Sequence, residues 1–208
     1  MFWVCPMCSS NNEGCAVVCM VCGATRPSTV LHYDIQAQMN NASGGVSDLL
    51  GAYKAFDAEA SYRSAVRTME TDMAAGVAVV LECAKRGYAP AQDRVAHCYR
   101  HGLGVPRDDL QAVYWYKQAA RAGVASAQVG LGDCYREGCG TIKDDAAAYD
   151  WYRRAAEQGD AAGKYKVGFC YRYGIGVKTD MEKARYFFRQ AASGGNVDAQ
   201  AALLEMSS

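Results

Sequence analysis

Apolar and polar positions recur with a period of 36 residues between Ala91 and Asn196. Each period holds two neighbouring aromatic residues followed, four positions later, by two alanines. Spacings of i, i+3 and i+4 predict a helix with one apolar stripe. The three stripes are Trp115, Tyr116, Ala119 and Ala120; Trp151, Tyr152, Ala155 and Ala156; and Phe187, Phe188, Ala191 and Ala192. Self-similarity at this period is typical of a solenoid.

A glycine-rich segment precedes each stripe. It begins with Cys-Tyr-Arg, which is expected to end a first helix, and continues as Gly-x-Gly. An aspartate then stands where the N-cap of the second helix is expected, and a glycine follows that helix where a left-handed C-cap favours one. These residues are Tyr99-Arg100, Gly102, Gly104, Asp108 and Gly123; Tyr135-Arg136, Gly138, Gly140, Asp144 and Gly159; and Tyr171-Arg172, Gly174, Gly176, Asp180 and Gly195. We interpret the Gly-x-Gly segments as turns between helices rather than phosphate loops, because none follows a predicted strand.

The combined pattern resembles the Sel-1-like repeat, a relative of the tetratricopeptide repeat. The resemblance implies a right-handed superhelix of paired antiparallel helices, whose grooves bind proteins or hold complexes together. It implies no reaction, and we expect no enzymatic activity. The predicted fold class is therefore all-α, a right-handed α-α solenoid.

The ends of the solenoid depart from the full repeat. Full repeats are predicted at 89–124, 125–160 and 161–196, within a solenoid that spans 48–208. Residues 48–88 form a degenerate capping repeat, with Ser47 as the N-cap of its first helix. Residues 197–208 form a terminal half repeat. Terminal repeats must be atypical because their outer faces have no neighbour to cover them.

A second motif lies at the N-terminus, where cysteines form two CxxC pairs. Cys5 and Cys8 are separated by ten residues from Cys19 and Cys22. Four thiolates with this spacing predict one structural Zn²⁺, around which a segment too short for its own core can fold. Disulfides and unused thiols are the alternatives, but no secretory signal precedes the motif, which favours zinc.

Residues 1–27 resemble the Ran-binding-protein-type zinc finger, the NZF fold. Besides the cysteines, the match includes Trp3, Asn12 and Arg26-Pro27. The resemblance implies a small zinc-bound finger of two β-hairpins, here followed by a linker at 28–47. Members of the family bind ubiquitin, single-stranded RNA or other proteins.

The residues that distinguish these branches weaken two of the three alternatives. Ser9-Ser10 stand where ubiquitin-binding members carry Thr-Phe, and Glu13 stands where RNA-binding members carry an aromatic residue that stacks on a base. No basic residue lies between the two cysteine pairs. RNA binding is weakened more than ubiquitin binding. The apolar strip Ala16–Val18 suits docking on a protein, or completes the finger's own core.

Composition narrows the function classes further. The chain of 208 residues has 22 lysines and arginines and 22 aspartates and glutamates, so no net field attracts nucleic acid or an anionic membrane. No apolar run approaches the roughly 18 residues of a membrane span. We expect an intracellular protein of the cytoplasm or nucleus, with the mitochondrion as an alternative.

Three further sets of residues invite a sharper interpretation. His97 and His101 are spaced i, i+4 and could hold a metal. The residues at the equivalent positions of the next two repeats do not form a shared set of metal ligands, so we favour a structural role. Tyr99, Tyr135 and Tyr171 are interpreted as core, with a groove lined by their hydroxyls as the alternative. Cys98, Cys134 and Cys170 should form a buried ladder too widely spaced for disulfides, and Cys15, Cys83 and Cys139 should be free thiols.

The sequence therefore predicts a non-enzymatic adaptor or scaffold that acts within a multi-subunit assembly, through the zinc finger and the solenoid. One alternative is an RNA-associated or ribonucleoprotein factor in which the finger contacts RNA. A second is a ubiquitin-linked quality-control adaptor. The identity of the protein partner stays open.

Overall fold

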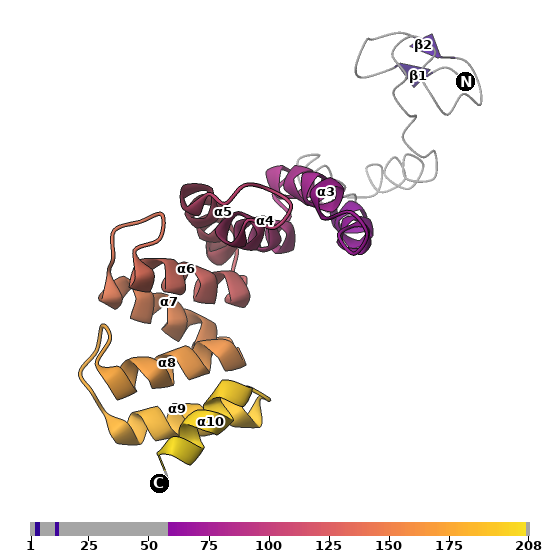
Figure 1. The fold of residues 1–208 in the computed structure, drawn as a ribbon. Coiled ribbons are helices and arrows are strands. Elements are labelled where there is room, and N and C mark those ends of the chain that lie inside the picture. The colour runs from indigo at the N-terminus through magenta and orange to yellow at the C-terminus, as the bar shows by residue number, and fades with distance from the viewer. Residues whose placement is uncertain (1–2, 5–10, 13–57, 207–208) are drawn as a thin grey trace, which may run out of the picture. The chain divides into compact units, whose positions relative to one another are not determined.

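The computed structural model describes residues 3–4, 11–12 and 58–206 (Figure 1). The chain divides into two compact units, Met1–Tyr53 and Lys54–Ser208. In the first unit, strand β1 (Trp3–Val4) pairs antiparallel with strand β2 (Asn11–Asn12). Trp3 is opposite Asn12 and Val4 is opposite Asn11.

Most of the predicted zinc finger lies outside the described residues. This applies to all four predicted ligands, Cys5, Cys8, Cys19 and Cys22, and to the predicted linker at 28–47. The helix expected after Ser47 also begins outside them. The zinc site and the finger fold stay predictions.

The second unit consists of antiparallel helices in repeated pairs. Residues 58–68 are helical and precede α3 (Met73–Lys85). The first helices of the following repeats are α4 (Ala89–His101), α6 (Ala125–Glu137), α8 (Ala161–Tyr173) and α10 (Val197–Glu205). The second helices are α5 (Asp109–Arg121), α7 (Asp145–Glu157) and α9 (Met181–Ser193). The predicted helical solenoid is confirmed for this part of the chain.

The predicted caps begin and end these helices. The carboxylate of Asp144 accepts the N–H of Ala147 at 2.9 Å, and Asp108 and Asp180 cap α5 and α9 in the same way. Each first helix of a full repeat continues one residue beyond the predicted Tyr-Arg end. It stops at a glycine with positive φ, which is +74° at Gly138. Glycine is favoured there because it adopts this backbone conformation without steric cost.

The second glycine of each Gly-x-Gly loop is needed for packing between repeats. A Cβ on Gly140 would overlap the carbonyl oxygen of Asp109, at the start of the preceding second helix. A Cβ on Gly176 would overlap the carbonyl oxygen of Asp145 in the same way. Each loop therefore rests directly on the backbone of the repeat before it.

Aromatic rings and small residues form the core between paired helices. Tyr152 and Phe188 are buried, and they occupy space that a side chain at Gly132 or Gly168 would need. Trp115 is buried, whereas its counterparts Trp151 and Phe187 are half-buried. The second aromatic residue of each stripe is therefore the one that every full repeat buries.

The repeated cysteines are buried, as predicted. Cys98, Cys134 and Cys170 are buried free thiols. Tyr99, Tyr135 and Tyr171 are half-buried and pack against the core, as predicted. The hydroxyl of Tyr171 lies 3.0 Å from that of Tyr149, so it bonds within the protein rather than lining an open groove.

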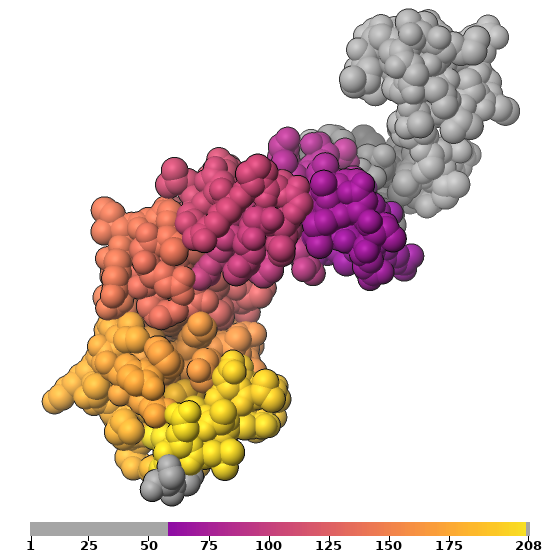
Figure 2. Space-filling model, viewed as in Figure 1, coloured from indigo at the N-terminus to yellow at the C-terminus, as the bar shows by residue number. Residues whose placement is uncertain are grey.

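Helices contact their neighbours in the chain, and the first helix α6 also contacts the first helices α4 and α8. The colours of Figure 2 follow this order from α3 to α10. No helix in residues 58–206 is long and apolar enough to cross a membrane.

Candidate functional site

A pocket of about 410 Å³ opens between α4 and α6. We call it the first pocket. Its lining combines charged, histidine and small residues from consecutive repeats. These residues are Asp93, Arg94, His97, Arg100 and His101 from α4, Tyr116 from α5, and Ser126, Val129, Gly130 and Asp133 from α6.

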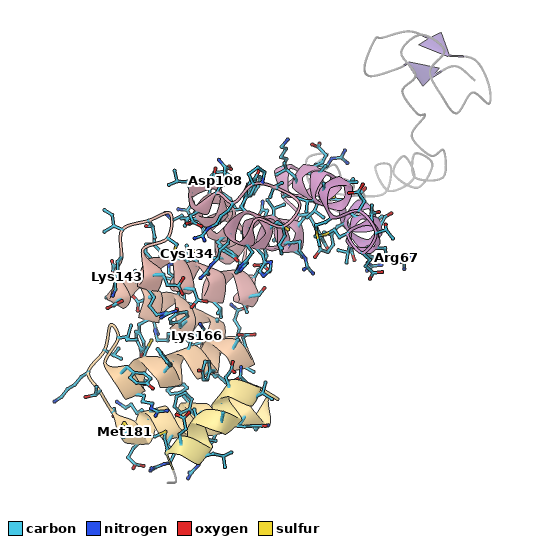
Figure 3. The ribbon with its side chains drawn as sticks, in the orientation of Figure 1. Arg67, Asp108, Cys134, Lys143, Lys166 and Met181 are labelled. Atoms are coloured by element: carbon cyan, nitrogen blue, oxygen red, sulfur yellow. The ribbon has the colours of Figure 1, made fainter. Side chains whose placement is uncertain are left out.

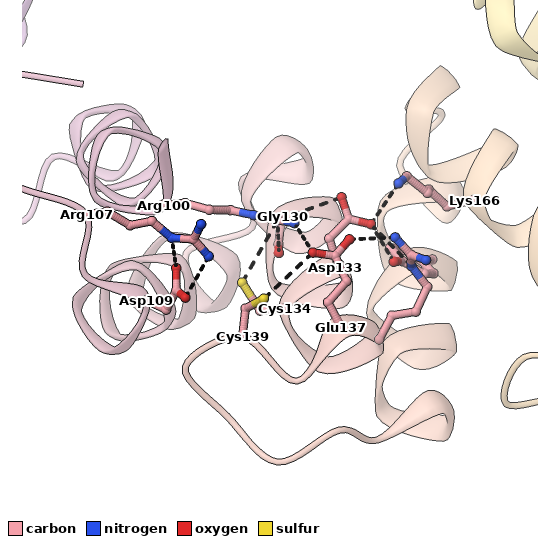
Figure 4. Close-up of polar contacts among 11 residues, drawn as sticks. Arg100, Arg107, Asp109, Gly130, Asp133, Cys134, Glu137, Cys139 and Lys166 are labelled. Atoms are coloured by element: carbon pink, nitrogen blue, oxygen red, sulfur yellow. Dashed lines mark hydrogen bonds and ion pairs between the residues drawn. The ribbon is translucent and has the colours of Figure 1, made fainter. Parts of the chain in front are cut away.

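Asp133 connects three consecutive first helices at the edge of this pocket (Figure 4). Its carboxylate accepts hydrogen bonds from Lys166 Nζ of α8 at 2.7 Å and from the Tyr152 hydroxyl at 2.6 Å. Arg100 of α4 approaches it to 3.9 Å. The Asp133 side chain is only 17% exposed, so these partners replace most of its contact with water.

An arginine recurs near the end of each first helix and bonds to the next repeat where an acid is present. Arg100 donates to Glu137 at 2.8 Å, and Arg172 donates to Glu205 at 3.1 Å. Arg136 pairs instead with Glu137 of its own helix at 2.6 Å. Phe169 stands on α8 where Asp133 stands on α6, so the next repeat offers Arg136 no carboxylate at that position.

The first pocket exists because Gly130 has no side chain. Gly130 lies against the ring of Tyr116, and a Cβ there would come within 2.6 Å of the ring. One repeat later the equivalent residue is Lys166, whose Nζ lies 5.8 Å from the centre of the Tyr152 ring. Lys166 covers that ring and bonds to Asp133, so the same space is filled. Figure 3 shows Cys134 of α6 and Lys166 of α8 on neighbouring first helices.

A second pocket of about 280 Å³ occupies the equivalent place two repeats along, between α8 and α10. Ala202 stands there in the position of Gly130 and Lys166. Tyr165, Phe169 and Tyr173 replace Asp93, His97 and His101 of the first pocket. One face of the first helices therefore carries the first pocket, a filled position and the second pocket, in that order.

The first pocket carries charges of both signs. Burial raises the pKa of Asp93. The hydrogen bond that Ser126 Oγ donates to it at 2.8 Å lowers this pKa, but by less. Burial lowers the pKa of His97, and the nearby His101 and Arg94 lower it further. Arg94 is exposed and pairs with no carboxylate among the described residues. It is the cation on this rim best placed to pair with an external carboxylate.

Two histidines lie side by side at the rim of this pocket. The rings of His97 and His101 lie 4.4 Å apart between centroids. Within residues 58–206, no group of three or more histidine, cysteine, aspartate or glutamate side chains is arranged to hold a metal.

The sequence predicted no pocket at this place, although a signal for it was present. Comparing position 130 with position 166 shows a glycine where the next repeat has a lysine. A missing side chain at a repeated position is a sign of an open space between repeats.

The Sel1 repeat matches residues 89–124, 125–160 and 161–196. The chain belongs to the Sel1 repeat family. The resemblance to Sel-1-like repeats is therefore confirmed, and the resemblance of residues 1–27 to a zinc finger stays a prediction. No curated protein matches the chain.

Two solved structures illustrate the Sel1 fold. A protective antigen of uropathogenic Escherichia coli with an SLR fold, c5321, is 32% identical with a TM-score of 0.65; the match covers 80% of this chain and 34% of that one. A Sel1 repeat protein from Oxalobacter formigenes is 26% identical with a TM-score of 0.68, over 70% of this chain and 60% of that one. The chain thus spans about a third and about three fifths of these relatives.

Proposed function

We propose that the chain is a non-enzymatic adaptor that holds a protein partner against the face of its first helices, within a multi-subunit assembly. The observation that carries this proposal is the repeat-equivalent placement of the two pockets on one helical face. Membership of the Sel1 repeat family supports it, because a solenoid of this kind offers an extended surface to a partner.

The chemistry of the pockets indicates the kind of segment that fits. The first pocket favours an acidic side chain, because Arg94 is free to pair with it while Arg100 is already bonded to Glu137. The second pocket offers the rings of Tyr165, Phe169 and Tyr173 to an apolar side chain, and its lining also includes Arg172, Asp198 and Glu205. The pockets are two repeats apart, roughly 20 Å if packed helices set the spacing. An extended segment of about six residues spans that distance.

The predicted zinc finger adds a second contact in this proposal. A finger at 1–27, tethered by residues 28–47, gives each of two weak contacts a high effective concentration for the other. Docking of the finger on a protein is favoured over RNA or ubiquitin by Ser9-Ser10, Glu13 and the apolar strip Ala16–Val18. This part rests on the predicted zinc site.

Site-specific photocrosslinking in the native cell tests the proposed surface. A photoreactive residue replaces either His101 or Gln111. His101 is exposed at the rim of the first pocket, and Gln111 is exposed on the second helix α5. We expect a discrete protein adduct from position 101 that survives nuclease, and none from position 111. Equal adducts from both positions would contradict the proposed face. A nuclease-sensitive adduct would favour the RNA-associated alternative, and an adduct with ubiquitin the quality-control alternative.

A further inference from the structure

The first helices of the three full repeats end in the same backbone motif. The residue after the glycine with positive φ donates its backbone N–H to the carbonyl of the residue five positions earlier. The two bonded residues thus begin and end a stretch of six. These bonds are Leu103 to Cys98 at 3.0 Å, Cys139 to Cys134 at 3.1 Å and Ile175 to Cys170 at 3.1 Å. This 6→1 bond defines a Schellman motif, in which the side chains of the two bonded residues commonly make an apolar contact.

Two of the three repeats carry an apolar residue at that position. Leu103 is exposed, and Ile175 packs against the core cluster that contains Cys170. In the middle repeat the residue is Cys139. Among residues 58–206, this is the helix end at which both residues joined by the 6→1 backbone hydrogen bond are cysteines.

The hydrogen bond also limits how far apart the two cysteines lie. With N and O 3.1 Å apart, standard bond lengths keep the two Cα atoms within about 7 Å. A disulfide requires about 4.4–6.8 Å between Cα atoms. Figure 4 shows both sulfur atoms beside Arg100 and Glu137, and Cys139 is close enough to influence the ionisation of Cys134.

The two thiols differ in their access to solvent. Cys134 is buried, and burial raises its pKa to about 11. Cys139 lies in the loop and is half-buried. Arg100 Nη1 lies 4.0 Å from Cys134 Sγ, where its charge stabilises a thiolate on that sulfur. A reagent in solution therefore meets Cys139 first, and Cys134 is held beside it as the resolving thiol.

We propose that Cys134 and Cys139 are an oxidisable pair that a small-molecule disulfide converts into an intramolecular disulfide. The Cys139 thiolate attacks the reagent and forms a mixed disulfide, releasing one small thiolate. The Cys134 thiolate then attacks Cys139 Sγ and displaces the second. The two protein thiols lose two electrons, the reagent gains them, and the two protons leave with the two small thiols.

Peptide mapping of the full chain after exposure to oxidised glutathione tests this pair. Trypsin cleaves at Arg136, between the two cysteines, so the peptides ending at Arg136 and Lys143 stay joined only through the proposed disulfide. We expect this joined species in oxidised protein and its loss after reduction. Mapping the N-terminal cysteines separately keeps their chemistry apart from this result.

Two variants make the result specific. Cys139→Ile reproduces the residue found at position 175 and should abolish the joined species without loss of helix. Ile175→Cys should create the same linkage to Cys170, with Arg172 as the intervening cleavage site. A stable glutathione adduct on Cys139 beside a reduced Cys134, or no reaction at Cys139 in folded protein, would overturn the proposal.

Discussion

Gly130 and Lys166 occupy the same position in consecutive repeats, yet only the lysine covers the ring beneath it. Lys166 bonds to Asp133 at 2.7 Å and closes the surface between α6 and α8. Gly130 leaves the equivalent surface between α4 and α6 open. A change of one side chain at a repeated position therefore separates an open pocket from a filled surface.

Removing the Asp133 carboxylate should destabilise the solenoid. Asp133→Ala leaves Lys166 and the Tyr152 hydroxyl without their acceptor in a largely buried place, at a cost of about 2 kcal/mol. Chemical denaturation followed by circular dichroism measures it. Glu157→Ala is the control, because it breaks the exposed Arg153–Glu157 pair and should change the free energy of unfolding by under about 0.5 kcal/mol. Similar losses in both variants would contradict the role given to Asp133.

Two loop glycines with positive φ should respond differently to alanine. Gly159→Ala meets no neighbouring atom, so only the strained backbone conformation costs stability, about 1 kcal/mol. Gly140→Ala adds an overlap with the backbone of Asp109 and should cost roughly 3 kcal/mol or more. Thermal unfolding of the two variants compares these costs. If Gly140→Ala proves as mild as Gly159→Ala, the loop does not rest on the preceding repeat as described.

Acid should weaken the cap of α9. The backbone N–H of Lys183 bonds to the Asp180 carboxylate and lowers its pKa, with a further contribution from the Lys183 ammonium. A lowered pKa in the folded state stabilises the fold above the unfolded pKa of about 4, and this stability is lost as pH falls through the folded value. Asp180→Asn keeps a cap acceptor but cannot titrate.

The Tm of the Asp180→Asn variant should therefore fall less than that of the wild type between pH 7 and acid. Asp150→Asn, at an exposed position on α7 outside any cap, is the control. Parallel pH profiles for wild type and Asp180→Asn would exclude a titrating cap at this position.

Zinc analysis tests the N-terminal prediction. Purified full-length protein should contain about one zinc per chain, and Cys5→Ser or Cys19→Ser should lose it. The helical circular dichroism of the solenoid should persist after chelation, because residues 58–206 hold no group of three or more side chains arranged to bind a metal. A zinc content well below one per chain would remove the finger from the proposed function.

Much of the solenoid could be predicted because each repeat carries its own local signals. Asp144 as a cap, Gly138 as a helix end and the buried Cys134 follow from a pattern that recurs every 36 residues. These features depend on backbone conformation and on contacts within one pair of helices. Three in-phase copies make each of them visible without any knowledge of the fold.

Contacts between repeats were harder to predict. The first pocket depends on which side chain of α6 lies over Tyr116 of α5, and the repeat alignment does not give that distance. The Cys134–Cys139 contact was missed for a different reason. Alignment at the repeat period compares Cys134 with cysteines a full repeat away, whereas its thiol neighbour lies across its own helix end.

A protein partner is proposed to dock on the face of the first helices. Affinity isolation of the tagged full chain from its native cell, with and without nuclease, measures this directly when the wild type is compared with Arg94→Glu. Arg189→Glu, an exposed charge reversal on the second helix α9, is the matched control. We predict a stoichiometric partner that survives nuclease, persists with Arg189→Glu and binds Arg94→Glu about tenfold more weakly, or about 1.4 kcal/mol. Associates that vanish with nuclease, or a partner that both variants retain equally, would contradict the account.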